Sequence, residues 1–344
     1  RLAVLWAGYS FSKEYNQARG HAYAITDIRN ILRTGGPTGP DDSPMPNTCW
    51  TCKGPDVPRV MNEIGVAGFY KGSWSSRGEQ IINPIGCADC HDPVTMNLRI
   101  TRPALIEAFE RQGKDITGAS HQEMRSLVCA QCHVEYYFKG EGNYLTFPWD
   151  KGRSAEAMEE YYDNAEFSDW THSMSRATML KAQHPDYEVF MTGIHADRGV
   201  ACADCHMPYI TEGGMKFADH HVRSPLDNVA NSCQVCHREE TDRLVANVYE
   251  RQDQIIENRD QLERLIVRIE VVQDNCIRCH EQIGHGFKYL GGDSHQYEEF
   301  TERLCWDCHR EVPHGRVNSL TSTPWARVPL PESPVPEWLK SFTR

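Results

Sequence analysis

The most regular hydrophobic pattern of the chain lies between about residues 239 and 269, a stretch without glycine or proline. Its apolar side chains recur at intervals of seven residues, with two more on the adjoining seam. They are Leu244, Val248, Ile255, Leu262, Leu265 and Ile269. This spacing is typical of a long helix whose apolar side is covered. We predict an amphipathic helix that packs either on its own domain or against another subunit.

Shorter patterns precede this helix. A helical stretch is expected from His21 to Arg33, and another over residues 154–163. A later helical pattern stops at Pro185, because proline cannot continue a helix. The C-terminal end is rich in proline and is expected to be extended. Together these patterns predict a mainly α, loop-rich fold with little sheet.

The 14 cysteines change this picture, because they form seven pairs with two residues between the partners. The pairs are Cys49 with Cys52, Cys87 with Cys90, Cys129 with Cys132, Cys202 with Cys205, Cys233 with Cys236, Cys276 with Cys279, and Cys305 with Cys308. The residue directly after each pair is, in order, Lys53, His91, His133, His206, His237, His280 and His309. Cys-x-x-Cys followed by histidine is the attachment motif of c-type haem, in which the thiols bond to the porphyrin and the histidine coordinates iron. We predict seven covalent haem c groups.

Structural zinc is the alternative interpretation of paired cysteines. Zinc would use two pairs per site, and it gives no reason for a histidine directly after each second cysteine. The repeated histidine therefore favours haem. Because haem is attached to cysteines outside the cytoplasm, we expect a periplasmic protein.

Composition agrees with a core built on cofactors. The mean hydropathy of −0.59 is low for a chain of 344 residues, and stacked porphyrins would supply the missing apolar surface. No apolar run approaches the roughly 20 residues of a membrane-spanning helix. The formal net charge of −12 argues against nucleic acid as a partner. The expected architecture is a multihaem cytochrome c whose core is a stack of covalent haems.

Lys53 stands where the other motifs have histidine. A haem needs two axial ligands to carry electrons and one open position to be a catalyst. A primary amine must also lose its proton before it binds a metal. We infer that the Lys53 haem is catalytic and that the others deliver electrons. Ten histidines outside the motifs are candidate second axial ligands: His21, His121, His172, His184, His195, His220, His221, His285, His295 and His314.

The first five motifs, with lysine in the first, resemble in type and order those of the ammonia-forming pentahaem cytochrome c nitrite reductases. The likeness covers about residues 1–268. It extends to six further segments: Arg19-Gly20-His21, Leu32-Arg33-Thr34-Gly35, His133-Val134-Glu135-Tyr136-Tyr137-Phe138, Lys181-Ala182-Gln183-His184-Pro185, Gly193-Ile194-His195 and Asp219-His220.

This resemblance implies that Arg33, Tyr136 and His184 line the open face of the Lys53 haem. Arg33 and His184 would supply positive charge and hydrogen-bond donors to a small anion. Tyr136 would act as a donor rather than a base, because the pKa of a phenol is near 10. His184 would relay protons near neutral pH.

The resemblance further implies a calcium ion and three distal haem ligands. The calcium ligands would be the carboxylate of Glu135, the side-chain oxygen of Gln183, and the backbone carbonyls of Tyr136 and Lys181. Such hard oxygen ligands suit calcium. The distal ligands of the second, third and fifth haems would be His220, His21 and His195, with His221 a close alternative to His220.

Residues 269–344 depart from that family. They resemble the C-terminal half of the membrane-anchored tetrahaem cytochrome that oxidises quinol and supplies the reductase with electrons. We therefore predict two domains, 1–268 and 269–344, and expect the reductase part to lack its N-terminal start and its later helices. The distal ligand of the fourth haem would then come from His285, His295 or His314, or from a second chain. A natural fusion, a chimera or a composite of two subunits would each explain the join.

The sequence thus predicts six-electron reduction of nitrite to ammonium at the Lys53 haem. The expected partners are a quinol-oxidising membrane cytochrome or another redox donor, in a homo-oligomer or multi-subunit complex. The alternative is a non-catalytic electron-transfer protein in which Lys53 only tunes the potential of its haem. A multihaem oxidase of reduced nitrogen compounds would share the same pocket chemistry.

Overall fold

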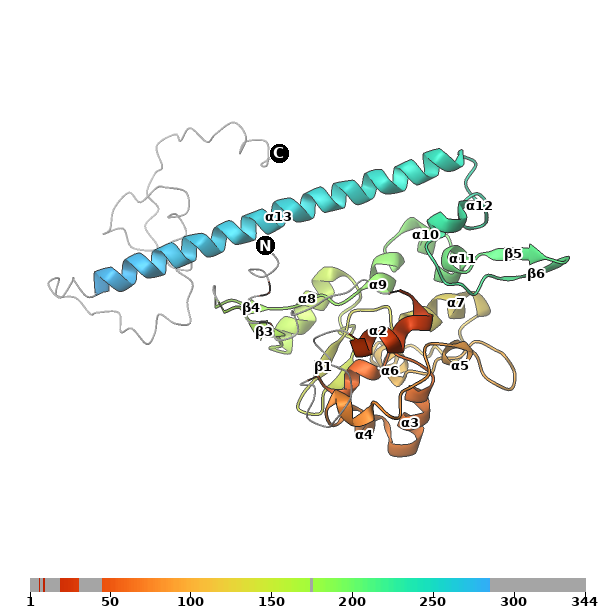
Figure 1. Cartoon of the computed structure of the whole chain (residues 1–344), viewed down its shortest axis with the longest axis horizontal. Coiled ribbons are helices and arrows are strands. Elements are labelled where there is room, and N and C mark those ends of the chain that lie inside the picture. The colour runs from red at the N-terminus through yellow and green to blue at the C-terminus, as the bar shows by residue number, and fades with distance from the viewer. Residues whose placement is uncertain (1–5, 7–8, 10–18, 31–44, 174–175, 285–344) are drawn as a thin grey trace. The chain divides into compact units, whose positions relative to one another are not determined.

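The computed structural model describes residues 6, 9, 19–30, 45–173 and 176–284, with side chains to residue 265. The chain divides into two compact units. The larger contains residues 2–171 and 178–262, and the smaller contains Arg1, His172–Ala177 and the residues from Glu263 onward. Figure 1 shows that short helices and long connections make up most of the larger unit.

The first part of the larger unit is helical. Its α-helices are α2 (Ala24–Asn30), α3 (Asp56–Ile64), α4 (Val66–Tyr70), α5 (Cys87–Cys90), α6 (Pro103–Arg111) and α7 (His121–Ala130), and its 3₁₀ helices are η1 (His21–Tyr23), η2 (Asn47–Trp50) and η3 (Trp74–Arg77). α6 begins with proline at its first position, where the missing N–H costs nothing. α7 begins with a capping box in which Ser120 and Glu123 bond to each other's backbone amides.

Three antiparallel two-stranded sheets are present in the described residues. β1 (Tyr137–Lys139) pairs with β2 (Tyr144–Thr146), β3 (Trp170–Thr171) with β4 (Thr178–Met179), and β5 (Tyr209–Glu212) with β6 (Met215–Ala218). The remaining short helices are α8 (Ala155–Asn164), α9 (Asp186–Met191), α10 (Ile194–Asp197), α11 (Cys202–His206), η4 (Pro225–Asn228) and α12 (Val229–Ser232). The prediction of a mainly α, loop-rich fold with little sheet is confirmed.

The long helix predicted near residue 239 is α13 (Thr241–Gly284), which spans 44 residues. It extends beyond the predicted end and runs without interruption through residue 268, where the sequence places a domain boundary. That boundary stays a prediction. Val248, Ile255 and Leu262 of the seven-residue repeat are exposed, and the partner of this seam also stays a prediction. No helix in the described part of the chain is long and apolar enough to cross a membrane.

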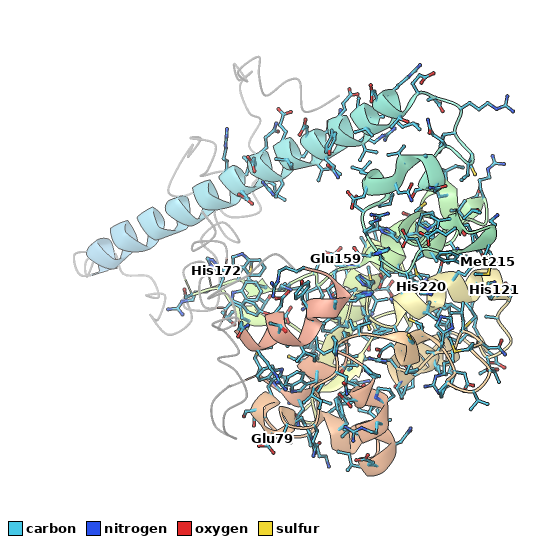
Figure 2. The ribbon with its side chains drawn as sticks, turned by 45° about the vertical axis from the view of Figure 1, so that its right-hand side comes forward. Glu79, His121, Glu159, His172, Met215 and His220 are labelled. Carbon is cyan, nitrogen blue, oxygen red and sulfur yellow. The ribbon has the colours of Figure 1, made fainter. Side chains whose placement is uncertain are left out.

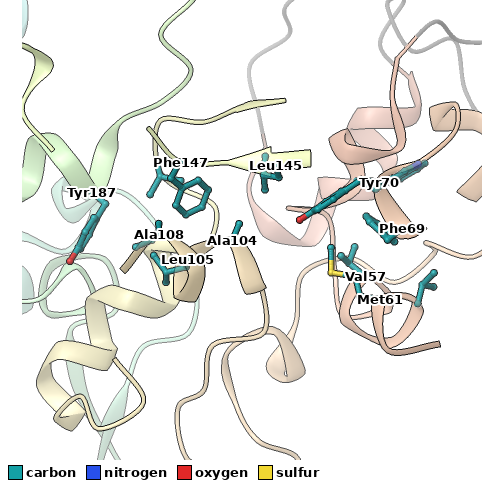
Figure 3. Close-up of a cluster of buried hydrophobic side chains, with 14 of the residues drawn as sticks. Val57, Met61, Phe69, Tyr70, Ala104, Leu105, Ala108, Leu145, Phe147 and Tyr187 are labelled. Atoms are coloured by element: carbon teal, nitrogen blue, oxygen red, sulfur yellow. The ribbon is translucent and has the colours of Figure 1, made fainter. Parts of the chain in front are cut away.

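A hydrophobic core fills the larger unit between the first three cysteine motifs and the β1–β2 hairpin. α3 contributes Val57, Val60 and Met61 from one face, as expected for apolar side chains three or four residues apart. Figure 3 shows Leu145 between the group around Val57 and the group around Leu105 and Phe147. Fully buried Trp50 stacks on Trp74 with ring centroids 4.2 Å apart and donates its Nε1–H to the Trp74 carbonyl at 2.8 Å. This core therefore anchors the first cysteine motif from inside.

Candidate functional site: a chain of haem motifs

The five cysteine motifs between Cys49 and His237 are all built on single turns. In the second, third and fifth motifs the amide of the histidine bonds to the carbonyl of the first cysteine, at 2.8–2.9 Å. In the first motif the Lys53 amide instead bonds to the Trp50 carbonyl at 2.9 Å, which gives a tighter turn. None of the ten cysteines of these five motifs forms a disulfide.

The last two predicted motifs are not described at the level of side chains. Cys276, Cys279 and His280 belong to the part of α13 whose side chains are not described. Cys305, Cys308 and His309 lie outside the described residues altogether. The described motifs therefore account for five of the seven predicted haem sites. Haem attachment to the pair Cys276 and Cys279 and to the pair Cys305 and Cys308 stays a prediction.

Three motif histidines each face a second histidine from a distant segment. The ring centroids are 6.3 Å apart for His133 and His21, 6.2 Å for His91 and His220, and 6.0 Å for His237 and His195. Two metal–imidazole bonds of about 2 Å, plus about 1.1 Å from each nitrogen to its ring centre, predict roughly 6.2 Å. These separations fit haem iron held between two imidazoles, in the pairing that the resemblance implies. The ring of His184 also lies 6.1 Å from that of His133, so the distance alone does not select His21, and the pairing stays a prediction.

In three of these histidines, His91, His133 and His220, Nδ1 has a hydrogen-bond partner that orients the ring. Nδ1 of His91 lies 2.7 Å from the Met96 carbonyl, and Nδ1 of His220 lies 2.7 Å from the Ala218 carbonyl. His220, labelled in Figure 2, follows β6 by two residues. Such contacts fix the tautomer and leave Nε2 available to a metal. His221, the alternative to His220, has its Nδ1 bonded to Asp219, and the ring that faces His91 is that of His220.

Contacts between cysteines of different motifs give the order of the motifs in space. Cys52 neighbours Cys132, Cys129 neighbours Cys202, and Cys205 neighbours Cys233. The order is therefore first, third, fourth and fifth motif. Cys90 of the second motif lies near Cys132 of the third, so the second motif branches from the same point.

Two of the three predicted pocket residues lie together. The rings of Tyr136 and His184 have centroids 5.5 Å apart, and His184 lies 6.1 Å from the ring of His133 in the third motif. Burial is the main cause of a lowered pKa of His184. His184 is therefore neutral at pH 7 and offers one donor and one acceptor. Arg33 lies outside the described residues, so its place in the pocket stays a prediction.

The predicted calcium ligands are also neighbours. The buried carboxylate of Glu135 accepts hydrogen bonds from the Gln183 amide at 2.5 Å and from the Tyr162 hydroxyl at 2.9 Å. The Gln183 side-chain oxygen accepts one from the Lys181 ammonium at 2.6 Å. Burial raises the pKa of Glu135 to about 7, against the effect of these hydrogen bonds.

Two further acid groups, buried Glu188 and partly buried Asp169, bond to the segments that carry Glu135 and Lys181, and this fits a bound cation. Glu188 accepts bonds from the Glu135 amide and from Trp149 through one oxygen, while its other buried oxygen has no hydrogen-bond partner. Asp169 accepts a bond from the Lys181 amide at 2.7 Å. Burial raises the pKa of Glu188 and of Asp169. The described residues hold no group of three or more His, Cys, Asp or Glu side chains placed to bind a metal, so a cation here would need carbonyl oxygens as well.

Sequence reasoning missed the residues between the paired cysteines. Asp89 of the second motif and Gln131 of the third are buried and bonded to the segment Thr101-Arg102. Arg102 is itself buried, with a relative exposure of 1%. The signal that could have found them is a polar or charged residue between the two cysteines of a motif.

Comparisons with known proteins agree with this geometry. A family model described as cytochrome c552 matches residues 1–274. Cytochrome c-552 of Parabacteroides distasonis is 63% identical over 270 residues, which are 78% of this chain and 55% of the relative. Cytochrome c-552 of Bacteroides thetaiotaomicron is 62% identical over 270 residues, with the same two shares. The chain therefore spans about half the length of the curated relatives that it matches.

A solved structure is similar to most of the fold. It is the catalytic subunit of cytochrome c nitrite reductase from Desulfovibrio desulfuricans ATCC 27774, a protein described as having two calcium sites. The TM-score is 0.69 at 36% sequence identity, over 87% of this chain and 64% of that one. Because the family model and these relatives match most of the sequence, the chain belongs to the cytochrome c552 family.

Proposed function

We propose that this protein reduces nitrite to ammonium at a c-type haem whose proximal ligand is Lys53. One observation carries the proposal. Three motif histidines face a second histidine at a distance that leaves room for an iron atom between the two rings, whereas the first motif has lysine in place of histidine. A haem with two axial ligands from the protein carries electrons, whereas a haem with one open position can bind and reduce a substrate. Membership of the cytochrome c552 family and the likeness to a nitrite reductase support this assignment.

The reaction takes up six electrons and eight protons and releases ammonium and two waters. When bound, the haem groups supply the electrons and the open iron position at which a small anion binds. The spatial order of the motifs provides the route for the electrons, since the third motif touches both the first and the fourth. Electrons that arrive at the second or the fifth motif would therefore reach the first motif through the third.

The chain's own side chains would bind nitrite and supply protons. Arg33 would hold the anion by its fixed positive charge, and Tyr136 would donate a hydrogen bond from its hydroxyl. Neutral His184 would take protons from solvent and pass them on, because its imidazole has one donor and one acceptor.

Calcium would hold these pocket residues in register. Glu135 and Tyr136 are adjacent in one segment, and Gln183 and His184 are adjacent in another. The hydrogen bond between Glu135 and the Gln183 amide already ties the two segments together. A cation on the Glu135 carboxylate, the Gln183 side-chain oxygen and the neighbouring carbonyls would strengthen this tie. The role of the calcium ion would be structural, because no pocket side chain binds it. Tyr136 would contribute only its backbone carbonyl.

The C-terminal residues would be the entry point for electrons. We assign residues 269–344 to a segment that resembles half of a quinol-oxidising membrane cytochrome. One haem would be attached to Cys276 and Cys279 with His280 on its iron, and another to Cys305 and Cys308 with His309. The total would then be seven haem c groups. The protein would work in the periplasm, in an oligomer or complex that receives electrons from such a cytochrome or from another donor.

Electron paramagnetic resonance of the oxidised protein, combined with nitrite turnover, tests the proposal. One high-spin haem among low-spin haems is expected, together with ammonium formation from nitrite with an artificial reductant. His184→Ala and Tyr136→Phe should each slow turnover by about 10²–10³-fold, the usual cost of one preorganised donor. A spectrum in which all haems are low-spin, with no turnover, would favour the non-catalytic electron carrier.

A further inference from the structure

The buried guanidinium of Arg102 binds the backbone on both sides of Lys53. Its Nε donates to the Thr51 carbonyl at 3.0 Å, and its Nη2 donates to the Gly54 carbonyl at 2.9 Å. These carbonyls lie on either side of the dipeptide Cys52-Lys53. One planar group thus fixes the backbone both before and after the lysine.

The same side chain is tied to the second cysteine motif. Its Nη1 lies 2.6 Å from Oδ1 of Asp89, between Cys87 and Cys90, in an ion pair whose side chains are only 2% and 6% exposed. Nη1 also donates to the Thr101 hydroxyl at 2.5 Å. A buried ion pair is a weak source of stability, because desolvation offsets much of the attraction. What the pair does provide is a fixed orientation for the guanidinium.

The third motif completes this arrangement. The side-chain oxygen of Gln131, between Cys129 and Cys132, accepts bonds from the amides of Thr101 at 2.5 Å and Arg102 at 3.0 Å. Its amide nitrogen donates to the Asp89 carbonyl at 3.3 Å. The segment Thr101-Arg102 therefore joins three motifs through the residues between their cysteines.

We propose that Arg102 is a positioning residue that fixes the loop of Lys53 against the second and third motifs and so holds the lysine amine on its iron. The inference rests on the proposed function, because it takes Lys53 as the proximal ligand. A lysine side chain has four rotatable carbon–carbon bonds and is more flexible than a histidine side chain. A rigid backbone around Lys53 is therefore needed to hold its amine in place. Arginine suits the task, since its planar fork reaches two carbonyls and a carboxylate at once.

The test compares Arg102→Lys with a matched control in the holoprotein. Arg102→Lys keeps the positive charge beside Asp89 but loses the fork that reaches Thr51 and Gly54. The control is Arg125→Lys, because Arg125 is also buried and pairs with Asp204 of the fourth motif at 2.9 Å. Haem content, the high-spin resonance of the Lys53 haem, and kcat and KM for nitrite are measured for both variants.

For Arg102→Lys we expect full haem content, unchanged low-spin resonances, and a high-spin resonance that is broadened or partly converted to low-spin. The kcat should fall about 10–100-fold with little change in KM, because a misplaced iron harms the reaction more than anion capture. Arg125→Lys should leave the high-spin resonance as in the wild type. If Arg102→Lys does not take up haem, Thr101→Val carries the test. It removes the hydroxyl that accepts from Nη1 and donates to the Asp89 carbonyl and to Gln131, and it should change the same resonance to a smaller degree.

The inference is overturned if a fully loaded Arg102→Lys protein, or the loaded Thr101→Val protein in its place, has the wild-type high-spin resonance and kcat. It is also overturned if Arg125→Lys alters that resonance equally, because the effect would then be general. In both cases the wild type would still reduce nitrite, and the proposed function would stand. A wild type without a high-spin haem would instead refute the proposed function, and this inference with it.

Discussion

Gly54, directly after Lys53, is the position where one added methyl group should be most harmful. Its φ of +153° lies in a region that side chains rarely adopt, and a Cβ built there would lie 2.0 Å from the Asn83 carbonyl oxygen. The same Cβ would lie 3.1 Å from the carbonyl carbon of Asn83 and 3.3 Å from that of Pro84. All three atoms belong to the backbone, so no side-chain rotation can relieve the contact. Gly54→Ala must therefore move one of the two segments.

The expected cost has two parts. A non-glycine residue at such a φ costs roughly 1–3 kcal/mol, and overpacking of a rigid site costs about 1–3 kcal/mol more. The free energy of unfolding should thus fall by roughly 2–6 kcal/mol, which for a domain of this size lowers the Tm by about 2–4 °C per kcal/mol. Because the shift begins at the residue after Lys53, nitrite turnover should fall by about 10²-fold or more.

Gly65→Ala is the matched control for this prediction. Gly65 also has a positive φ, of +78°, but nothing lies within 4 Å of the position of its Cβ. It should show the backbone cost alone, with the high-spin resonance of the Lys53 haem intact. Thermal unfolding followed by circular dichroism in the haem absorption band, together with steady-state nitrite reduction, measures both effects. Equal loss of Tm in the two variants, with turnover preserved in Gly54→Ala, would refute the reasoning.

Three further outcomes are expected. Burial alone would raise the pKa of Asp56, but hydrogen bonds from the amides of Asn83 and Ile82 hold this pKa below its ordinary value. A carboxylate with a lowered pKa in the folded state stabilises the protein above about pH 4, and this stabilisation is lost as the pH falls through the folded-state pKa. Asp56→Asn should therefore lower the free energy of unfolding at pH 7 by about 1–3 kcal/mol, with the gap to wild type closing in acid, and parallel pH curves for the two proteins would contradict this. Chelation of calcium should lower turnover and be reversed by added calcium, whereas Glu135→Gln should weaken that recovery; full activity of a calcium-free protein would show that the ion has no role. Removing residues 269–344 should slow reduction by a quinol-type donor but not by a small artificial reductant, and equal loss with both donors would point to a role in folding.

The sequence by itself determined the chemistry of the individual motifs. Two cysteines with two residues between them, followed by a metal ligand, act within one turn of backbone, so spacing alone predicts the attachment site. The fold class followed from local patterns as well, because amphipathic helices such as α13 are recognised from the spacing of their apolar residues. That Lys53 stands where the other motifs have histidine was likewise visible in the sequence.

Only the tertiary structure decided which distant residues meet. His21 faces His133, and His195 faces His237, across separations that no local pattern encodes. The order of the motifs in space differs from their order in the chain for the same reason, since it depends on which segments pack together. Arg102 shows this most clearly. Its proposed role depends on two carbonyls and one carboxylate that come together only in the folded protein.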